Sequence, residues 1–340
     1  MTPIQWFYSF LRQYKWKMFW GLVLVTILAI ASLVNPYISG MIVDDVINGG
    51  KTGMLPCLIA FLLGTIIVKG LCRFFSQVLF EVSSQGVLYS MRDKVYRKLL
   101  QEDFAFYNKN RTGDLMSRQT GDMDAIRHFV AYVIYIVYEN ILYFVFALLM
   151  IFKTDWKLAL CMLPAIPLTA LTTMSQSKNV HPAFGRCRQA FSSLNTYVQE
   201  NISGNRVVKA FAKEDYEMEK FAVENDGYRD AELGAAKIWR RYVPLFELWS
   251  NLLTIVLMLV GGWMVIRGEI TMGNFVTING YLWMLTQPLR MAGWWINDVQ
   301  RFTTSVEKIY HTYMAEPDVK KPAHPMHHRK LGGTVEFKDV

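Results

Sequence analysis

The chain has 340 residues, of which 52% are apolar, 14% aromatic and only 19% charged. Together with a mean hydropathy of +0.18, this composition excludes a disordered chain and argues against water as the only solvent. The net charge of +8 could indicate nucleic-acid binding, but the Lys and Arg residues gather between apolar stretches. Their placement therefore indicates membrane topology, and nucleic acid is not an expected partner.

Six stretches are apolar enough to cross a bilayer core of about 30 Å as helices. They are residues 19–43, 54–80, 129–152, 158–174, 243–266 and 275–296. The fourth is short and contains Pro164 and Pro167, which predict a kink. Residues 1–17 mix aromatic and polar side chains and predict an N-terminal elbow helix lying in the membrane interface. The predicted fold class is an all-α membrane protein with six transmembrane helices.

Lys and Arg are concentrated before the first span, in the segments 81–128 and 178–241, and after the sixth span. Because basic loops stay on the cytoplasmic side, both termini are predicted to be cytoplasmic. The two long loops are rich in helix formers, so we expect them to extend the spans as helices far beyond the bilayer. The predicted membrane domain is 18–313, and a linker follows at 314–332.

Each long loop contains a distinctive motif. The first reads FYNKNRTGDLMSR at 106–118 followed by DMDAI at 122–126, and the second reads VQENISGNRVVKAF at 198–211. In this order and around six spans, they resemble the membrane domain of ATP-binding-cassette (ABC) exporters of the multidrug, lipid and peptide type. The resemblance covers nearly the whole chain, and it implies a domain-swapped dimer that works by alternating access.

The resemblance also implies a short coupling helix in each loop, at about 104–111 and 210–217, that docks on a nucleotide-binding domain. The coupling residues expected from it are Phe106, Tyr107, Arg111, Asp114, Phe211, Glu214, Asp215 and Tyr216. The simpler alternative for Asp114 is helix capping, in which its carboxylate accepts from backbone N–H groups.

Ionisable and aromatic residues inside the spans predict a substrate cavity, because charges at membrane depth usually face a cavity or a partner. Lys69 and Arg73 are one helical turn apart. Tyr132, Tyr135, Glu139, Tyr143 and Phe146 share one helix face. The candidate lining residues are Lys69, Arg73, Tyr132, Tyr135, Glu139, Glu247, Asn251, Arg290 and Trp294. In the alternative, the spans extend past the bilayer and these charges pair with each other or reach the interface.

Phosphate-binding and magnesium-binding motifs are absent from the sequence, so the chain itself is expected to bind no cofactor and to hold no catalytic residue. ATP and Mg²⁺ are expected to bind in a nucleotide-binding domain. Residues 333–340 resemble the first strand of such a domain. Metal binding by His324, His327 and His328 is the alternative to a simple linker, and no metal site is predicted.

The predicted function is the transmembrane subunit of an ATP-driven exporter of amphipathic substrates in the bacterial plasma membrane. Its expected partners are the lipid bilayer, a second half-transporter, nucleotide-binding domains and the substrate. The alternatives are an ion-coupled carrier that uses Glu139 and Glu247, a membrane enzyme that uses the histidines, and an ion channel.

Overall fold

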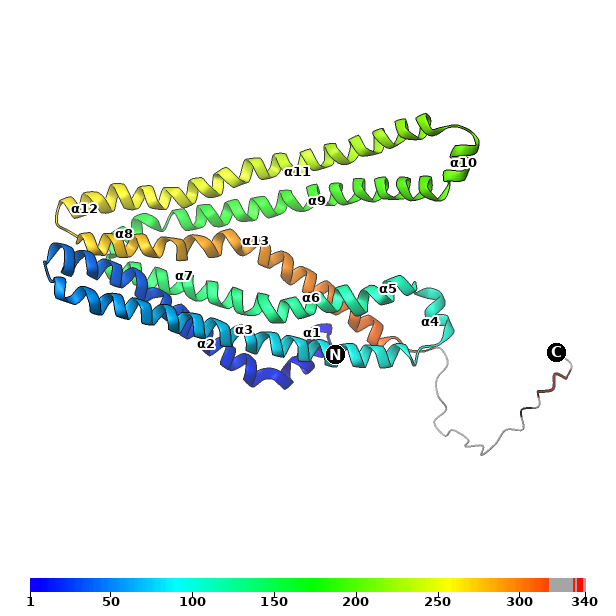
Figure 1. Ribbon diagram of the computed structural model, residues 1–340, viewed down its shortest axis with the longest axis horizontal. Coiled ribbons are helices and arrows are strands. Elements are labelled where there is room, and N and C mark those ends of the chain that lie inside the picture. Colours follow the sequence, from blue (N-terminus) through cyan, green and yellow to red (C-terminus); the bar gives the residue numbers. More distant parts are fainter. Residues whose placement is uncertain (318–332, 334, 339–340) are drawn as a thin grey trace. The chain divides into compact units, whose positions relative to one another are not determined.

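The computed structural model describes residues 1–317, 333 and 335–338, except for the side chains at 165, 169, 177, 181, 246 and 250. All regular secondary structure in this part of the chain is helical (Figure 1), which confirms the predicted all-α fold class. The chain divides into two compact units. The first comprises Met1–Tyr14, Ser84–His128 and Arg301–Val340, and the second comprises Lys15–Ser83 and Phe129–Gln300. The predicted membrane domain 18–313 is thus divided between them.

The second unit is built from long helices joined by short turns. The helices are α2 (Lys15–Met41), the first part of α3 (Leu55–Leu99), α7 (Ile134–Thr154), α8 (Trp156–Met162), α9 (Ala165–Ser203), α10 (Asn205–Ala210), α11 (Glu214–Val256), α12 (Gly262–Ile266) and the first part of α13 (Met272–Met314). The predicted kink in the fourth span lies between α8 and α9, where Pro164 is the N-cap of α9.

Five helical segments are long and apolar enough to cross a membrane by length and composition: Pro3–Asn48, Thr52–Leu99, Thr112–Thr154, Trp156–Ser203 and Glu214–Ile266. The predicted sixth span lies in α13, which does not meet that measure because Asn279, Gln287 and Arg290 lower its hydropathy. Its residues Ile278 and Tyr281 are nevertheless fully buried in the core of the second unit. A helix shielded by its neighbours needs less apolar surface than one surrounded by lipid.

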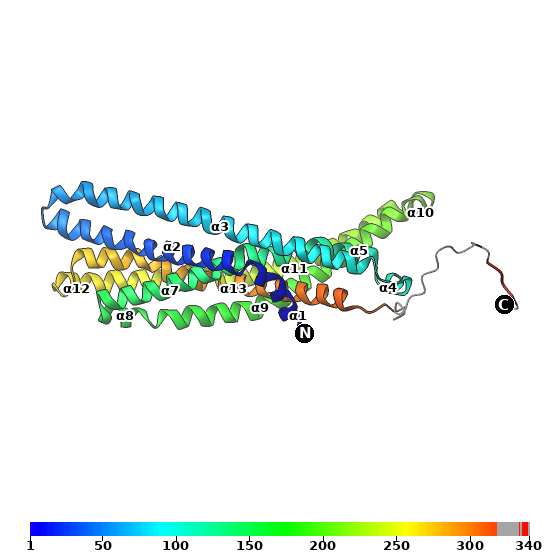
Figure 2. The same cartoon turned by 90° about the horizontal axis from the view of Figure 1, so that it is seen from below.

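The core of the second unit joins α2, α7, α8, α11 and α13. Leu28, Ala147, Leu158, Leu257 and Ile278 contribute to one buried apolar cluster. Figure 2 shows α2 lying along α7, and these two helices pack closely. In lipid, apolar burial gives helices little driving force to associate, so close packing and polar contacts hold such a bundle together.

Small residues allow the close approach of α2 and α13. The position that a Cβ atom would occupy on Gly280 is 2.6 Å from Cβ of Pro36, and Gly273 lies against the backbone of Gly40. Asp44 accepts a hydrogen bond of 2.7 Å from the Gly273 amide at the start of α13. The carboxylate also suits the positive end of the helix dipole.

Helices α9 and α11 form an antiparallel pair along their length (Figure 1), with α10 at its tip. Ala183, Cys187 and Ala235 form a small buried cluster between them, where short side chains let the backbones approach. The rings of Phe191 and Tyr228 meet nearer the tip, with centroids 5.4 Å apart. The second predicted loop is therefore a helical hairpin.

The first unit contains α1 (Pro3–Leu11), α4 (Phe104–Lys109), α5 (Thr112–Ser117), α6 (Met123–His128) and the C-terminal parts of α3 and α13. A capping box between Thr2 and Gln5 starts α1. Trp6, Phe7 and Phe10 are buried inside the unit, while Ile4 and Tyr8 are exposed. The elbow helix thus exposes only part of its apolar surface.

The C-terminal predictions are only partly covered. Helix α13 ends at Met314, and most of the linker 314–332, including His324, His327 and His328, lies outside the described residues. Gly333 and 335–338 have no regular secondary structure. The strand at 333–340 stays a prediction.

Candidate functional site

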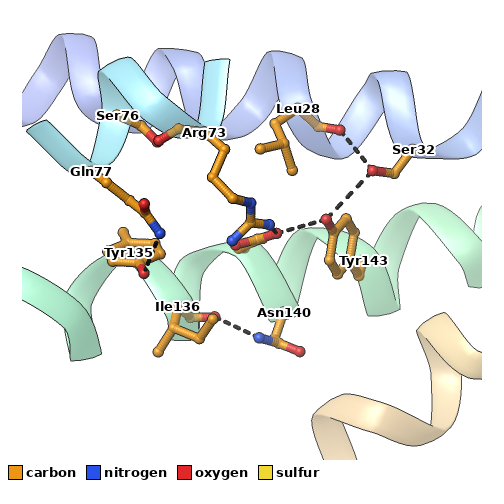
Figure 3. Close-up of polar contacts among 10 residues, drawn as sticks. Leu28, Ser32, Arg73, Ser76, Gln77, Tyr135, Ile136, Asn140 and Tyr143 are labelled. Atoms are coloured by element: carbon orange, nitrogen blue, oxygen red, sulfur yellow. Dashed lines mark hydrogen bonds and ion pairs between the residues drawn. The ribbon is translucent and has the colours of Figure 1, made fainter. Parts of the chain in front are cut away.

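A polar cluster joins α3, α7 and α2 within the second unit (Figure 3). Arg73 on α3 forms an ion pair with Glu139 on α7, and Tyr143 donates a hydrogen bond of 2.6 Å to the same carboxylate. Ser32 on α2 lies 3.4 Å from the Tyr143 hydroxyl, and it donates to the backbone carbonyl of Leu28. The cluster thus connects three helices through one carboxylate.

Burial makes this carboxylate the constrained member of the cluster. The Glu139 side chain is only 3% exposed, whereas that of Arg73 is 41% exposed. A buried carboxylate without partners is very unfavourable, and Arg73 and Tyr143 supply the partners that Glu139 needs. The guanidinium keeps an accessible side, and Lys69 one turn away on α3 is half-buried.

A second contact ties α3 to α7 one turn further along. Gln77 donates a hydrogen bond of 3.3 Å to the Tyr135 hydroxyl. The ring of Tyr135 also packs against Phe80 and Tyr132, with centroid distances of 5.4 and 5.6 Å. Tyr135 is buried, while Tyr132 is 41% exposed. The predicted face thus begins with Tyr132 in the helical turn Phe129–Val133 and continues along α7, where Tyr135 is covered by neighbouring side chains.

The structure brings together only some of the predicted cavity residues. Arg73, Glu139, Tyr135 and Tyr132 lie in or beside the cluster, with Lys69 on the same helix as Arg73. The remaining four are exposed and, among the described residues, no hydrogen bond or ion pair joins them to it: Glu247 and Asn251 on α11, and Arg290 and Trp294 on α13. Spacing identified the face of each helix but not which faces meet.

Sequence reasoning missed two members of the cluster, Ser32 and Gln77. Both are ordinary polar residues in apolar stretches, and nothing in their spacing distinguishes them. Tyr143 was predicted to share a helix face with Tyr135 and Glu139, because it lies four residues after Glu139.

The first loop has its short helix where the sequence predicted one. Helix α4 (Phe104–Lys109) is capped by Asp103, which accepts a hydrogen bond of 2.9 Å from the Phe106 amide. Phe104 is 88% exposed, but Phe106 is half-buried. Tyr107 donates a hydrogen bond of 2.8 Å to the carbonyl of Leu99, so part of its role is to fasten α4 to α3. Phe104 is the most exposed ring, and the motif did not single it out.

The structure does not show the alternative role of helix capping for Asp114. Asp114 is an exposed residue in the first turn of α5, and within 1–317 no backbone N–H donates to its carboxylate. Arg111, also exposed, occupies the N-cap position of this helix. Both side chains point into solvent in the described part of the chain and remain available for a partner.

The second loop differs from its predicted helix. The short helix α10 covers Asn205–Ala210, and the expected helix at 210–217 is interrupted by a turn. Ala212 adopts a left-handed backbone conformation with φ of 49°, which ends α10 and allows α11 to start at Glu214. Phe211 and Tyr216 are 72% and 51% exposed on either side of this turn. Asp215 is exposed in the first turn of α11.

A pocket of about 300 Å³ lies at this turn, lined by Val207, Val208, Phe211, Lys213, Tyr216 and Glu217. Its walls are largely apolar, and charged residues stand at its edge. Glu214 pairs with Lys209 at 2.8 Å, and this hydrogen bond lowers the pKa of Glu214. Hydrogen bonds from Tyr197 and Asn201 likewise lower the pKa of Glu217. The tip is thus a shaped apolar surface with fixed charges.

Residues 18–289 match the model of the ABC transporter transmembrane region. The chain belongs to this family. The matched range includes the residues of the polar cluster and the tips of both long loops. It confirms the resemblance seen in the motifs, identifies a multi-pass membrane protein, and gives no support to the ion-coupled alternative.

Similar proteins have related names. An uncharacterized ABC transporter ATP-binding protein, YknU of Bacillus subtilis, is 30% identical over 97% of this chain and 57% of its own length. The multidrug resistance-like ATP-binding protein MdlA of Escherichia coli is 28% identical over 92% and 53%. An ATP-dependent lipid A-core flippase of Syntrophus aciditrophicus is 25% identical over 92% and 51%. The ABC transmembrane chain described here thus spans somewhat more than half the length of these relatives.

Proposed function

We propose that this chain is the membrane-spanning part of an ATP-driven exporter that moves amphipathic or hydrophobic compounds out of the cytoplasm or the inner leaflet. The observation that carries the proposal is the family match across residues 18–289. Relatives named as a multidrug resistance-like protein and a lipid A-core flippase support a drug or lipid substrate, and a peptide is the further possibility that the motif resemblance implies.

In this proposal, nucleotide-binding domains bind ATP and Mg²⁺ and change position during the cycle. The tips of the two long loops contact these domains and move with them. The exposed rings Phe104, Phe211 and Tyr216 are the contacts that support this role. Buried aromatic anchors carry most of the energy of typical protein interfaces. Arg111, Asp114 and Asp215 add charges around them, and the pocket beside Phe211 can receive an apolar side chain.

The substrate path is proposed to pass the polar cluster in the second unit. Arg73 has an accessible side, and Lys69 lies one turn away on the same helix. These two basic side chains outnumber the single carboxylate of Glu139, which leaves an excess of one positive charge. Rings and mixed charge suit compounds with both an apolar body and a polar group. Exposed Glu247, Asn251, Arg290 and Trp294 would line the same path from α11 and α13.

A second copy or a related half-transporter is the proposed partner within the bilayer. In the most apolar stretch of the α3 segment, only 11% of the residues are buried, and in that of the α11 segment only 12%. These surfaces need lipid or another subunit around them. The pair α9 and α11, which packs mainly on itself, is the element proposed to cross to the partner. The distribution of Lys and Arg supports a cytoplasmic location for both termini, and the bacterial relatives support a bacterial membrane.

The test uses the protein together with its nucleotide-binding domains, reconstituted in lipid vesicles. ATP hydrolysis and transport are recorded with hydrophobic dyes, drugs and anionic lipids. Phe104→Ala and Phe211→Ala are compared with Tyr89→Ala, which removes an equally exposed ring from the shaft of α3. If each loop ring is an anchor worth about 2 kcal/mol, its loss weakens docking about 30-fold.

We expect substrate-stimulated hydrolysis in the wild-type protein, its loss in the two loop variants, and no change in Tyr89→Ala. Size-exclusion chromatography checks that each variant stays folded. If no compound stimulates hydrolysis and no ATP-dependent transport occurs, alone or with a co-expressed partner, the proposed function is wrong.

A further inference from the structure

Two charged residues of the first loop motif contact another helix of the first unit. Arg118 and Asp122 lie at the two ends of a π-helical turn, Arg118–Asp122, between α5 and α6 in the first unit. Both side chains reach the C-terminal part of α13. Arg118 donates a hydrogen bond of 2.7 Å to the Thr312 hydroxyl, and Ser305 donates one of 2.8 Å to the Asp122 carboxylate.

These contacts are well shielded from water. Ser305 and Thr312 are 3% and 2% exposed, and the Asp122 side chain is 14% exposed. Lys308 adds an ion pair to Asp122 at 3.6 Å. Ser305, Lys308 and Thr312 follow a spacing of three and four residues, so they lie on one face of α13.

The neighbouring face of α13 is held by the N-terminal helix α1. Trp6 packs against Tyr310 and Tyr313, with ring centroids 5.8 and 5.3 Å apart. Phe7 packs against Phe302 at 4.9 Å. The end of α13 is therefore contacted on two adjacent faces. Helix α1 packs against one face through aromatic rings, and the loop motif binds the other through charged hydrogen bonds.

The same loop carries α4, which ends only a few residues before α5 begins. Helix α13 is continuous from Met272 to Met314 and contains Pro288, and its part from Arg301 onward belongs to the same unit as the loop. A displacement of the loop is passed to this part of α13 through these side chains.

We infer that Arg118 and Asp122 are positioning residues that fasten α13 to the loop carrying α4, so that movement of α4 by the nucleotide-binding domain is converted into movement of α13. This inference rests on the proposed function, and it assigns the second half of the loop motif a role in transmission instead of docking. The charged hydrogen bonds to Thr312 and Ser305 are the connection.

The test measures the number of substrate molecules transported per ATP hydrolysed by the complete transporter in vesicles. Arg118→Met and Asp122→Asn remove the charges, and Thr312→Val removes only the receiving hydroxyl while keeping the shape of the side chain. Thr304→Val is the matched control, because Thr304 is exposed on the same stretch of α13.

We expect the ratio of transport to hydrolysis to fall about tenfold in Arg118→Met, which corresponds to about 1.4 kcal/mol. Thr312→Val should give the same loss, and the double variant of Arg118 and Thr312 should lose no more than either single one. Hydrolysis and thermal stability stay near wild type, and Thr304→Val keeps the full ratio.

A purely structural role predicts that hydrolysis, transport and stability fall together, and this result would overturn the inference. Unchanged ratios in a wild-type protein that does transport would also overturn it while leaving the proposed function intact. Absence of ATP-dependent transport in the wild type would instead reject the proposed function itself. If Arg118→Met does not fold, the milder Thr312→Val decides.

Discussion

The ion pair between Arg73 and Glu139 makes a quantitative prediction about the stability of the second unit. In Arg73→Met, the Glu139 side chain, only 3% exposed, keeps the hydrogen bond of 2.6 Å from Tyr143 but loses its positive partner. Removing one partner of a buried pair typically costs about 3–5 kcal/mol, because the other charge stays buried and uncompensated. We expect a loss of this size in the free energy of unfolding.

Removing the carboxylate instead of the guanidinium should lower the free energy of unfolding by a smaller amount. In Glu139→Met, Arg73 keeps a side chain that is 41% exposed, so the guanidinium can turn towards water or lipid headgroups. The expected loss is about 1–3 kcal/mol, the range for breaking a single hydrogen-bonded contact. The double variant, with Met at both positions, should recover most of the loss of Arg73→Met, because no buried charge remains.

Reversible unfolding in mixed detergent and SDS micelles, followed by circular dichroism, measures these free energies. A double-mutant cycle then isolates the coupling between the two residues. Arg290→Met is the matched control, because Arg290 is an exposed cation on α13, and its loss should change stability by no more than about 0.5 kcal/mol. Equal losses in the two single variants, or a double variant that simply adds them, would refute the reasoning.

Two further predictions concern close packing and pH. Gly280→Ala should lower stability by about 1–3 kcal/mol because its Cβ would lie 2.6 Å from that of Pro36, whereas Gly64→Ala, with nothing within 4 Å, should be neutral or stabilising; the same unfolding assay compares them. At the tip of the α9–α11 pair, a hydrogen bond from Tyr197 lowers the pKa of Glu217, so the contact stabilises the tip above the ordinary carboxyl range near about pH 4 and is lost as the pH falls through the lowered pKa. Hydrogen exchange at the tip should accelerate over that range in the wild type and show no such transition in Glu217→Gln, and an identical pH profile in both would contradict the assignment.

Local signals explain what the loop sequences predicted well. The motif resemblance implied a short helix at 104–111, and Asp103 is the local cap that starts α4 there. The second loop was less readable. A left-handed residue at Ala212 ends α10, although alanine gives no sequence signal for such a conformation, so the predicted helix was displaced. A glycine at this position would have predicted the turn, because glycine adopts positive φ without strain.

The polar cluster illustrates the limit of periodicity. The spacing of Tyr132, Tyr135 and Glu139 identified one face of α7, but it could not identify the neighbour of that face. Arg73 is 66 residues away in sequence, and its pairing with Glu139 depends on how α3 packs. Glu247 and Arg290 had equally good spacing, yet both are exposed.

The sequence by itself determined the membrane class, the helical fold, the two long loops and the family, because hydropathy, capping and motifs are properties of contiguous residues. Only the tertiary structure decided which charges pair, which ring of α4 is outermost, and that Arg118 reaches Thr312 across 194 residues. The physical reason is that a helical pattern specifies the direction of a side chain from its own axis, while its partner is set by the packing of another helix.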